Sequence, residues 1–402
     1  MGYTRVIKLL LLCCVFTFMT TGCWDRKELN EISLISGIAI DKGENKKYKL
    51  SAETVNITEL SPKTKGGETP SVVYTQEGDT ISELVQKMNT GLSRKLILSH
   101  MSVVVISEEI AKSSLMEFLD YMDRYREVRN DFNLVVAKGV EAEEILTVLY
   151  PFQKISTLKL KVQLNTLQDE WGGDPDVRLK DFIKALVSKG RSPVAVALTV
   201  SGTKHIQNST DIMKHPIPPS LITVPGMAVF DKEKLVGYLP LEGVRVYLWT
   251  QNKLRHTSLS VPCSKDKYIN VLVYNSSTNV KARGKNDVPH IQLNIKVETI
   301  LDGTQCGADL SKHSSYVDYE KKAADFIRAE VLATIKKVQK DFGTDIFGFG
   351  DHMHLQDPAY FHKVSDRWQE AFKKANIEVK VDARIRRSGL DTKSFLQQLP
   401  PR

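Results

Sequence analysis

Cysteine is scarce in this chain of 402 residues, which contains five in all. Three of them, Cys13, Cys14 and Cys23, fall at the very start, so only Cys263 and Cys306 remain for the rest of the chain. The sequence therefore excludes a fold held together by many disulfides. A single disulfide between Cys263 and Cys306 can form outside the cell, but their spacing does not establish that the two residues meet.

Long hydrophobic runs and a strong excess of one charge are also missing. After the first 22 residues, no stretch approaches the roughly 20 apolar residues that a membrane-spanning helix needs. The net charge is +8, and removal of Arg5 and Lys8 with the first 22 residues leaves 54 basic against 48 acidic residues. This mild and dispersed excess suits a protein near anionic lipid headgroups. It is not the clustered basic surface of a nucleic-acid-binding protein, so we expect no nucleic-acid partner.

Catalytic motifs are absent as well. The chain has no Gly-x-Ser-x-Gly and no His-Glu-x-x-His pattern. Gly348-Phe349-Gly350 follows a predicted helix and lacks the third glycine of a dinucleotide-binding motif. This stretch instead favours a chain reversal with a positive φ at glycine and two aromatic rings packed beneath it. We therefore expect a protein that is not an enzyme and holds no cofactor.

The one histidine cluster comprises His352, His354 and His362, and alternate spacing can place two imidazoles on one face of a strand, as a metal site requires. No cysteine or glutamate-rich segment frames these histidines, and they follow a glycine-rich turn. A solvated loop is the favoured interpretation, so we expect no bound metal.

What the chain does have is an export signal in residues 1–22. Arg5 and Lys8 provide a positive start, an apolar run of about ten residues follows, and small residues precede Cys23. Gly22-Cys23 resembles the end of a bacterial lipobox, in which the cysteine is lipidated and becomes the first residue of the mature protein. We therefore predict Cys23 as the lipidation site, so that the lipid is the only membrane anchor of a palmitoylated lipoprotein.

The rest of the chain predicts an α+β fold with two to three mixed domains behind the signal peptide. Strands and helices alternate through an N-terminal α/β domain over residues 23–201, and a proline-rich polar linker follows over residues 202–222. A C-terminal α+β domain then spans residues 223–390, with a second division near residue 300 left open, and residues 391–402 form a tail.

Within the C-terminal domain, a strand–turn–strand unit over residues 226–239 leads into a helix over residues 241–254. A polar loop is predicted over residues 279–289, and a long helix over residues 318–342 carries an apolar stripe. Trp368 and Phe347 lie in apolar surroundings, so we expect both in the core.

Several blocks of this sequence resemble the Ger(x)C family, the lipoprotein C subunits of spore germinant receptors. The blocks are listed in chain order: Cys23-Trp24-Asp25-Arg26-Lys27-Glu28-Leu29, Gly37-Ile38-Ala39-Ile40-Asp41, the strand–turn–strand unit over 226–239, Asp345-Ile346-Phe347-Gly348-Phe349-Gly350, and the closing strand that ends in Arg386-Arg387-Ser388-Gly389-Leu390. Their collinear order from Cys23 to about Leu390 is more specific than any one motif.

The resemblance implies a lipid-anchored C subunit of a spore nutrient germinant receptor. It further implies A and B subunits as partners and a location on the outer face of the spore inner membrane. The alternative is a lipoprotein that itself binds a nutrient, as solute-binding proteins do. The charged residues fall on the polar faces of predicted helices and strands, and no inward-pointing polar cluster can be assigned from the sequence, which disfavours the alternative.

Overall fold

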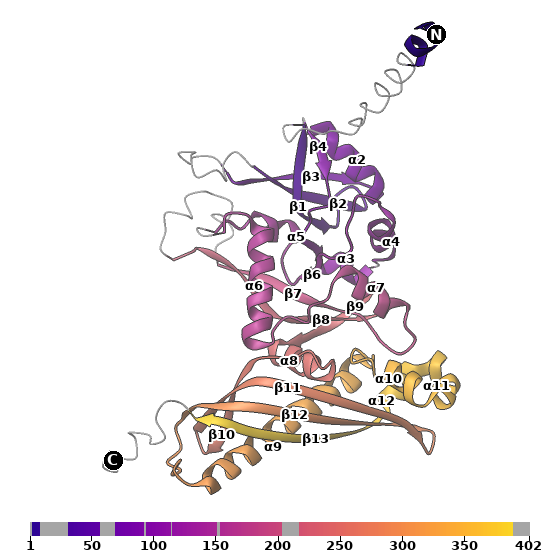
Figure 1. Cartoon of the computed structure of the whole chain (residues 1–402). Helices are drawn as coiled ribbons and strands as arrows, with labels where there is room; N and C mark the ends of the chain where they lie inside the picture. Colours follow the sequence, from indigo (N-terminus) through magenta and orange to yellow (C-terminus); the bar gives the residue numbers. More distant parts are fainter. Residues whose placement is uncertain are drawn as a thin grey trace.

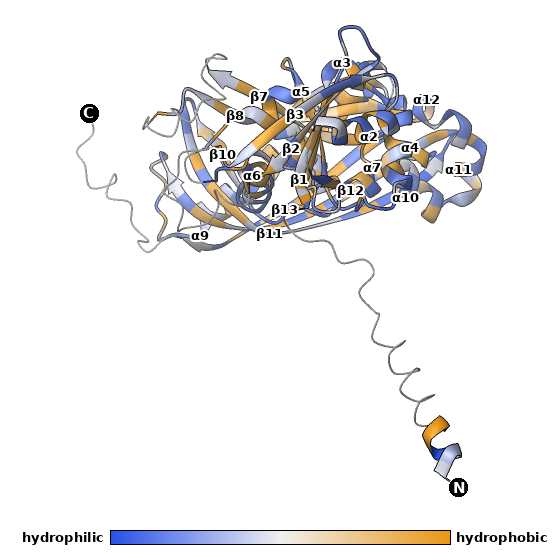
Figure 2. Cartoon of the chain, turned by 90° about the horizontal axis from the view of Figure 1, so that it is seen from above, coloured by the Kyte–Doolittle hydropathy of each residue, from blue (hydrophilic) through white to orange (hydrophobic). Residues whose placement is uncertain are grey.

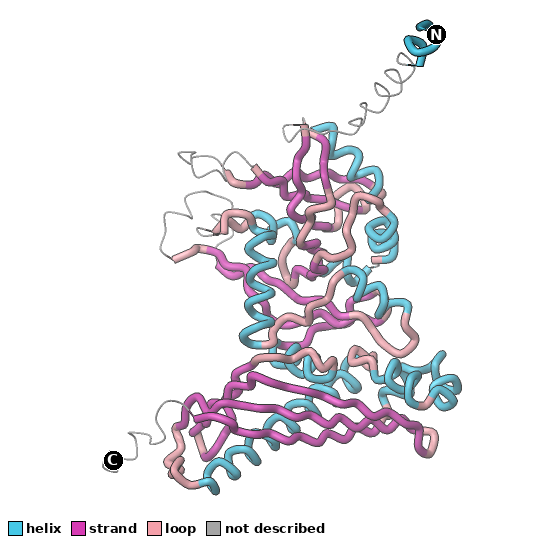
Figure 3. Tube along the Cα trace, viewed as in Figure 1, coloured by secondary structure: helices cyan, strands magenta, loops and turns pink. Residues whose placement is uncertain are grey.

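The computed structural model describes residues 2–8, 31–56, 69–91, 94–113, 115–150, 153–202 and 217–388. Two β-sheets, each packed with helices, organise these residues (Figure 1). The first sheet and its helices occupy the upper part of the view, and the second sheet with its long helix lies below. Helices and strands are interspersed in both parts (Figure 3), and the prediction of an α+β fold is confirmed.

The first sheet has the strand order β3-β2-β1-β5-β6-β7-β8-β9, and β4 pairs with the start of β1. Its centre is parallel, since β1, β5, β6 and β7 run in one direction, while β2, β3, β8 and β9 are antiparallel to their neighbours. Its strands are β1 (Ile32–Asp41), β2 (Tyr48–Val55), β3 (Ser71–Gly78), β4 (Lys95–Ile97), β5 (Val103–Ser107), β6 (Asn133–Ala137), β7 (Val194–Gly202), β8 (Ser220–Asp231) and β9 (Lys234–Pro240).

Helices cover both faces of this sheet, which explains the uninterrupted apolar sequences of its central strands. Every residue of β5 and β6 is buried, as expected for parallel strands with covered faces. The helices of this part are α2 (Ile81–Gly91), α3 (Glu108–Ser113), α4 (Met116–Arg124), α5 (Ala142–Thr147), α6 (Ser156–Trp171), α7 (Leu179–Val187) and α8 (Leu241–Thr250). The core beneath α5 and α6 is separate from the core that contains α2, α4 and α7.

Two buried acidic residues of the sheet fix the helices α5 and α6. Asp41 accepts hydrogen bonds from the backbone N–H groups of Ala142 (2.7 Å) and Glu143 (3.0 Å) at the start of α5. Glu53 accepts from the backbone N–H groups of Ser156 (3.0 Å) and Thr157 (3.1 Å) at the start of α6. The first N–H groups of a helix have no partner within the helix, so these carboxylates satisfy them from the neighbouring strands.

The second sheet has the order β10-β11-β12-β13 and packs against one long helix. Along β11 and β12, buried residues alternate with exposed or half-buried ones, so one face of the sheet lies against α9 and the other is open. The hydropathy colours in Figure 2 alternate along these strands accordingly. The elements of this part are β10 (Thr257–Ser264), β11 (Lys267–Lys285), β12 (Val288–Thr304), α9 (His313–Lys337), a π-helical turn (Val338–Phe342), α10 (Phe349–Gln356), α11 (Pro358–Val364), a 3₁₀ turn (Ser365–Arg367), α12 (Trp368–Lys373) and β13 (Asn376–Ser388).

The division between the two sheets differs from the predicted domain boundary. Most of the predicted linker lies outside the described residues, but the strands on either side of it, β7 and β8, pair directly with each other. The first sheet therefore continues across residue 223 and ends with β9, and the second sheet begins only after α8. Residue 300, left open as a second boundary, lies inside β12, which pairs with β11 and β13 on either side.

The predicted polar loop over residues 279–289 is wrong. These residues form the end of β11 and the start of β12, joined by a tight turn at Asn286 and Asp287, both with positive φ (51° and 59°). The segment looked like a loop because its outward residues are polar, whereas Val280 and Ala282 between them are buried.

Cys263 and Cys306 form a disulfide, which the sequence left open. Cys263 lies near the end of the edge strand β10, and Cys306 follows β12, so the bond joins two segments on either side of β11. The two cysteines are 43 residues apart in the sequence. Closing a loop of this length stabilises the folded state by about 4 kcal/mol if the entropy of the unfolded chain dominates.

Candidate binding pocket between the two sheets

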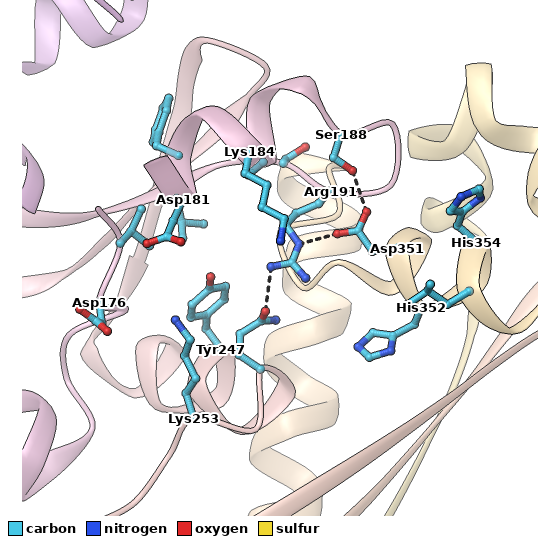
Figure 4. A pocket seen from close by; sticks show the side chains of 17 residues that line it. Asp176, Asp181, Lys184, Ser188, Arg191, Tyr247, Lys253, Asp351, His352 and His354 are labelled. Carbon is cyan, nitrogen blue, oxygen red and sulfur yellow. Dashed lines mark hydrogen bonds and ion pairs between the residues drawn. The ribbon is translucent and has the colours of Figure 1, made fainter. Parts of the chain in front are cut away.

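A pocket of about 540 Å³ lies where the first part of the chain meets the second (Figure 4). Its walls come from α7, from the segment that leads into β7, from the end of α8 and from α10. Ligand sites occur preferentially at such junctions, and the volume falls within the usual range for small-molecule pockets. This pocket is therefore the candidate functional site.

A buried carboxylate, that of Asp345, holds α10 in place beside the pocket. It accepts hydrogen bonds from the backbone N–H groups of Phe347 (3.0 Å), Gly348 (2.9 Å) and Gly350 (2.9 Å) and from the indole N–H of Trp368 (2.9 Å). Burial raises the pKa of Asp345 to about 6, so the carboxylate is largely ionised at pH 7 and faces the positive end of the α10 dipole.

The predicted chain reversal at this turn is confirmed. Gly348 has a φ of 73°, which residues with a side chain rarely adopt. Phe347 and Phe349 on either side are fully buried, and their rings stack with centroids 5.3 Å apart. Trp368 is also buried, so the prediction that Trp368 and Phe347 lie in the core is confirmed.

Two glycines allow the backbones of the two parts to touch at the pocket. A Cβ atom on Gly350 would overlap the Cα of Gly190, and one on Gly190 would lie 2.5 Å from the backbone nitrogen of Asp351. The backbone N–H of Ser192 donates to the carbonyl of Asp345 (2.7 Å) in the same region. The segment that leads into β7 is thus pressed directly against the start of α10.

Arg191 links the start of α10 to the end of α8 through hydrogen bonds. Its Nε donates to Asp351 Oδ2 (2.9 Å), and its Nη1 donates to Gln251 Oε1 (3.0 Å) at the end of α8. Ser188 Oγ donates to the other oxygen of Asp351 (2.7 Å), and Gln251 Nε2 donates to the carbonyl of Phe347 (2.7 Å). Charged hydrogen bonds therefore join three segments that are distant in the sequence.

Other polar groups point into the pocket. Tyr247 of α8, Lys184 of α7 and Lys253, which follows α8, also line the pocket. Figure 4 shows these three side chains extending toward the centre of the site. Burial raises the pKa of Tyr247 to about 12, so its hydroxyl remains protonated and can donate a hydrogen bond.

Two acidic residues, Asp176 and Asp181, also line the pocket. Asp176 Oδ1 accepts two hydrogen bonds from the guanidinium of Arg178 (3.2 and 3.0 Å). Asp181 Oδ2 accepts from the backbone N–H of Arg178 (3.2 Å) at the start of α7. In each carboxylate the second oxygen has no hydrogen bond with any residue that the structure describes. Both carboxylates act electrostatically on the hydroxyl of Tyr247, so acceptors and donors lie together in this pocket.

This cluster was not foreseen from the sequence, which offered no inward-pointing group of polar residues. Its members come from α7, from α8, from the residues just before α7 and from those just after α8, and only the packing of α7, α8 and α10 brings them together. One local signal was present, because Asp181 and Lys184 lie three residues apart and so share a face of α7.

Two of the three histidines considered as metal ligands line the same pocket. His352 and His354 both lie on α10, while His362 lies on α11 with its ring centroid 5.7 Å from that of His354. Burial lowers the pKa of His352, which favours its neutral form. The described residues contain no group of three or more His, Cys, Asp or Glu side chains arranged to hold a metal ion.

The predicted lipidation site, Cys23, lies outside the described residues, as do most of the predicted signal peptide and the predicted tail. The first described strand, β1, begins nine residues after Cys23. Among the helices that the structure describes, none has the length and apolar character required to cross a bilayer.

Comparison with known proteins shows similarity over both parts of the chain. Residues 25–200 match the family model of the spore germination protein N-terminal domain, and residues 225–389 match that of the spore germination B3/GerAC-like C-terminal domain. Spore germination protein KC of Bacillus subtilis (strain 168) is 30% identical over 394 residues, which cover 96% of this chain and 97% of that protein.

Other relatives are more distant but similarly complete. Spore germination protein B3 of Bacillus subtilis (strain 168) is 23% identical, with 90% of this chain and 93% of that protein covered. The crystal structure of the GerBC protein matches with a TM-score of 0.51 at 18% identity and covers 87% of this chain and 97% of that one. This structural match shows a shared fold.

Proposed function

Because the chain belongs to the Ger(x)C family of spore germination proteins, we propose that it is the lipid-anchored C subunit of a spore nutrient germinant receptor. The observation that carries this proposal is the similarity of both parts of the chain, in order, to proteins of spore germination, one of them 30% identical along nearly its whole length. We infer that the protein acts by contact with other receptor subunits rather than by catalysis, since no catalytic motif was found in its sequence.

In this proposal the protein resides on the outer face of the spore inner membrane and works with an A subunit and a B subunit. Attachment to the same membrane raises the effective concentration of neighbouring subunits, so that even a weak interface is occupied. The alternative of a lipoprotein that captures a nutrient by itself is favoured only by the pocket between the two sheets.

Affinity purification of the tagged full chain from detergent-solubilised spore membranes tests the receptor proposal. The proposed A and B subunits are expected to co-purify at levels well above those recovered with an unrelated tagged spore lipoprotein. Recovery of the two subunits at the same level with both baits would refute the proposed partnership.

Replacement of Cys23 by alanine tests whether this residue carries the proposed lipid anchor. One acyl chain holds a protein on a membrane only marginally, so stable attachment of a lipoprotein requires the two or more chains carried by its lipidated cysteine. The Cys23→Ala variant is therefore expected to lose most of its membrane-bound fraction or to remain unprocessed. Fractionation and mass determination of the mature N-terminus measure both effects.

Cys14→Ala is the matched control, because Cys14 lies in the predicted signal and is removed with it. This variant is expected to be processed and to attach to the membrane like the unchanged protein. A Cys23→Ala variant that is still correctly processed and membrane-bound would show that the anchor lies elsewhere.

A further inference from the structure

The outer strand of the second sheet, β13, has an open edge. It is yellow in Figure 1, and in the described part of the chain it pairs with β12 alone. The backbone N–H of Ile385 donates to Glu320 Oε1 of α9 (2.9 Å), so it points away from β12. Because backbone groups alternate in direction along a strand, those of residues 377, 379, 381 and 383 also point outward. These four have no hydrogen-bond partner on that side among the residues that the structure describes.

The face of β13 that lies toward α9 carries only apolar side chains between residues 377 and 385. Two of them, Val379 and Ala383, are buried. The other three, Ile377, Val381 and Ile385, pack against the core but are only partly buried. A further strand beside β13 would cover this remaining apolar surface.

The opposite face of β13 carries charges that alternate in sign. Glu378, Lys380, Asp382 and Arg384 are each more than half exposed. Neighbours along the strand form ion pairs, with Lys380 Nζ at 3.1 Å from Glu378 and Arg384 Nε at 3.0 Å from Asp382. Exposed pairs of this kind contribute little to stability, so these side chains are available to a partner.

This order of charges is complementary to itself. When a second copy of β13 is placed antiparallel, with Val381 opposite Val381, Lys380 faces Asp382 and Glu378 faces Arg384 of the other copy. A slip of two residues in either direction places Lys380 opposite Lys380 or Asp382 opposite Asp382. Charges of a single sign, which protect many sheet edges, would repel a second copy in every register.

The same register meets the two other requirements of a sheet. Residues 377, 379 and 381 then face residues 385, 383 and 381 of the second copy, so apolar side chains meet on the face toward α9. These are also the residues whose backbone groups point outward, as directly opposed pairs that exchange hydrogen bonds must do. Only the N–H of Ile385 has to leave its present acceptor, Glu320.

We propose that β13 is a self-association surface, at which two copies of this chain form a twofold dimer. The two β13 strands pair antiparallel about Val381 and join the two four-stranded sheets into one. Such an interface uses the same surface of both copies, as twofold symmetry requires. This inference depends on the edge of β13 alone and holds whichever receptor subunits the protein contacts.

Sedimentation velocity of the purified full chain over a range of concentrations tests the proposal. A reversible equilibrium between monomer and dimer is expected. Lys380→Glu and Asp382→Lys each place like charges opposite each other at two symmetric positions, so each is expected to raise the Kd of the dimer about ten-fold or more. A chain that is monomeric at every concentration, or a dimer that neither change weakens, would overturn the proposal, and the first result would leave the edge to a strand of another protein.

A mixture of the two variants gives the sharper result. When the Lys380→Glu chain meets the Asp382→Lys chain, opposite charges face each other again at both positions. The mixed dimer is therefore expected to form with a Kd close to that of the unchanged protein, although each variant alone associates weakly. A purely structural defect could not be repaired in this way, and a mixture that associates no better than its components would contradict the proposed pairing.

Lys281→Glu is the matched control. Lys281 is exposed on β11, which β12 separates from β13, and the substitution makes the same change of charge as Lys380→Glu. It is expected to leave the Kd of the dimer unchanged, and melting curves verify that all variants are folded. An equal loss of affinity in the Lys281 and Lys380 variants would show that overall charge, rather than the edge of β13, governs association, against the proposal.

Discussion

Replacement of Trp368 by alanine is expected to lower the free energy of unfolding by about 3–5 kcal/mol through the lost packing of a buried aromatic ring. Trp368 is 1% exposed, and its ring contacts that of Phe361, with 5.6 Å between the centroids. The same change removes the indole N–H that donates to Asp345, which adds about 1–3 kcal/mol for a buried carboxylate that loses a donor.

Three variants separate these contributions in denaturant titrations. Trp368→Phe keeps one aromatic ring but loses the hydrogen bond and part of the buried volume, so it is expected to cost at least about 1 kcal/mol but less than Trp368→Ala. Val187→Ala is the control, because Val187 is 75% exposed and its truncation is expected to change stability by less than about 0.5 kcal/mol. An unchanged stability of the Trp368→Ala variant, with loss of receptor function, would instead identify Trp368 as a contact for a partner.

Replacement of the buried Asp174 is expected to have the second large effect on the free energy of unfolding. It is 2% exposed, and only one of its carboxylate oxygens has a hydrogen bond, from the backbone N–H of Asp176 (3.0 Å). Burial raises the pKa of Asp174 from 3.8 to about 7. The folded state therefore holds this proton more tightly than the unfolded state, so the contribution of Asp174 to stability is most favourable below about pH 4 and is lost as the pH rises toward 7. At 1.36 kcal/mol for each unit of pKa, the ionised group costs roughly 4 kcal/mol above pH 7.

Asp174→Asn removes the charge with little change of shape and can still accept the hydrogen bond from Asp176. The variant is expected to be more stable than the unchanged protein at pH 8, by up to roughly 4 kcal/mol, and to lose this advantage near pH 4. Denaturant titrations at the two pH values measure the difference. Asp41 and Asp345, whose pKa values burial also raises, are common to both proteins and cancel in the comparison.

Asp302→Asn is the control for this experiment, since Asp302 is exposed on β12 and the same change there is expected to have no effect at either pH. A stability difference between the Asp174→Asn variant and the unchanged protein that is the same at pH 4 and pH 8 would show that ionisation of Asp174 is not the cause.

Local patterns in the sequence predicted many of the individual elements. The strand–turn–strand unit over residues 226–239 appears as β8 and β9, with a tight turn at Lys232, where φ is 53°. The long amphipathic helix appears as α9 with its π-helical end. These elements are set by short-range periodicity and turn chemistry, which a single sequence displays directly.

Two interpretations depend on pairing between distant segments, which local composition does not display. The prolines between β7 and β8 suggested a linker, but a polar connection between two paired strands has the same composition. In the hairpin of β11 and β12 the polar residues belong to an open sheet face, and only the turn at Asn286 and Asp287 marked the true break.

The pocket could not be predicted for a related reason. Tyr247 lies in a helix in which eight of ten residues are buried, so from the sequence it is an ordinary core residue. Its place in the wall of the pocket depends on how α7 and α10 pack beside α8. Long-range packing of this kind has no local signature, whereas the predicted lipidation of Cys23 depends only on residues that are adjacent in the sequence.

The direct pairing of β7 with β8 limits how the protein can be divided into fragments. The two family models meet between residues 200 and 225, which suggests a natural place to cut the chain for separate expression. A fragment that ends there would lack β8 and β9 and would leave β7 as a bare outer strand with unpaired backbone groups. Such edges template aggregation, so an N-terminal fragment should extend through Pro240 to keep its sheet complete.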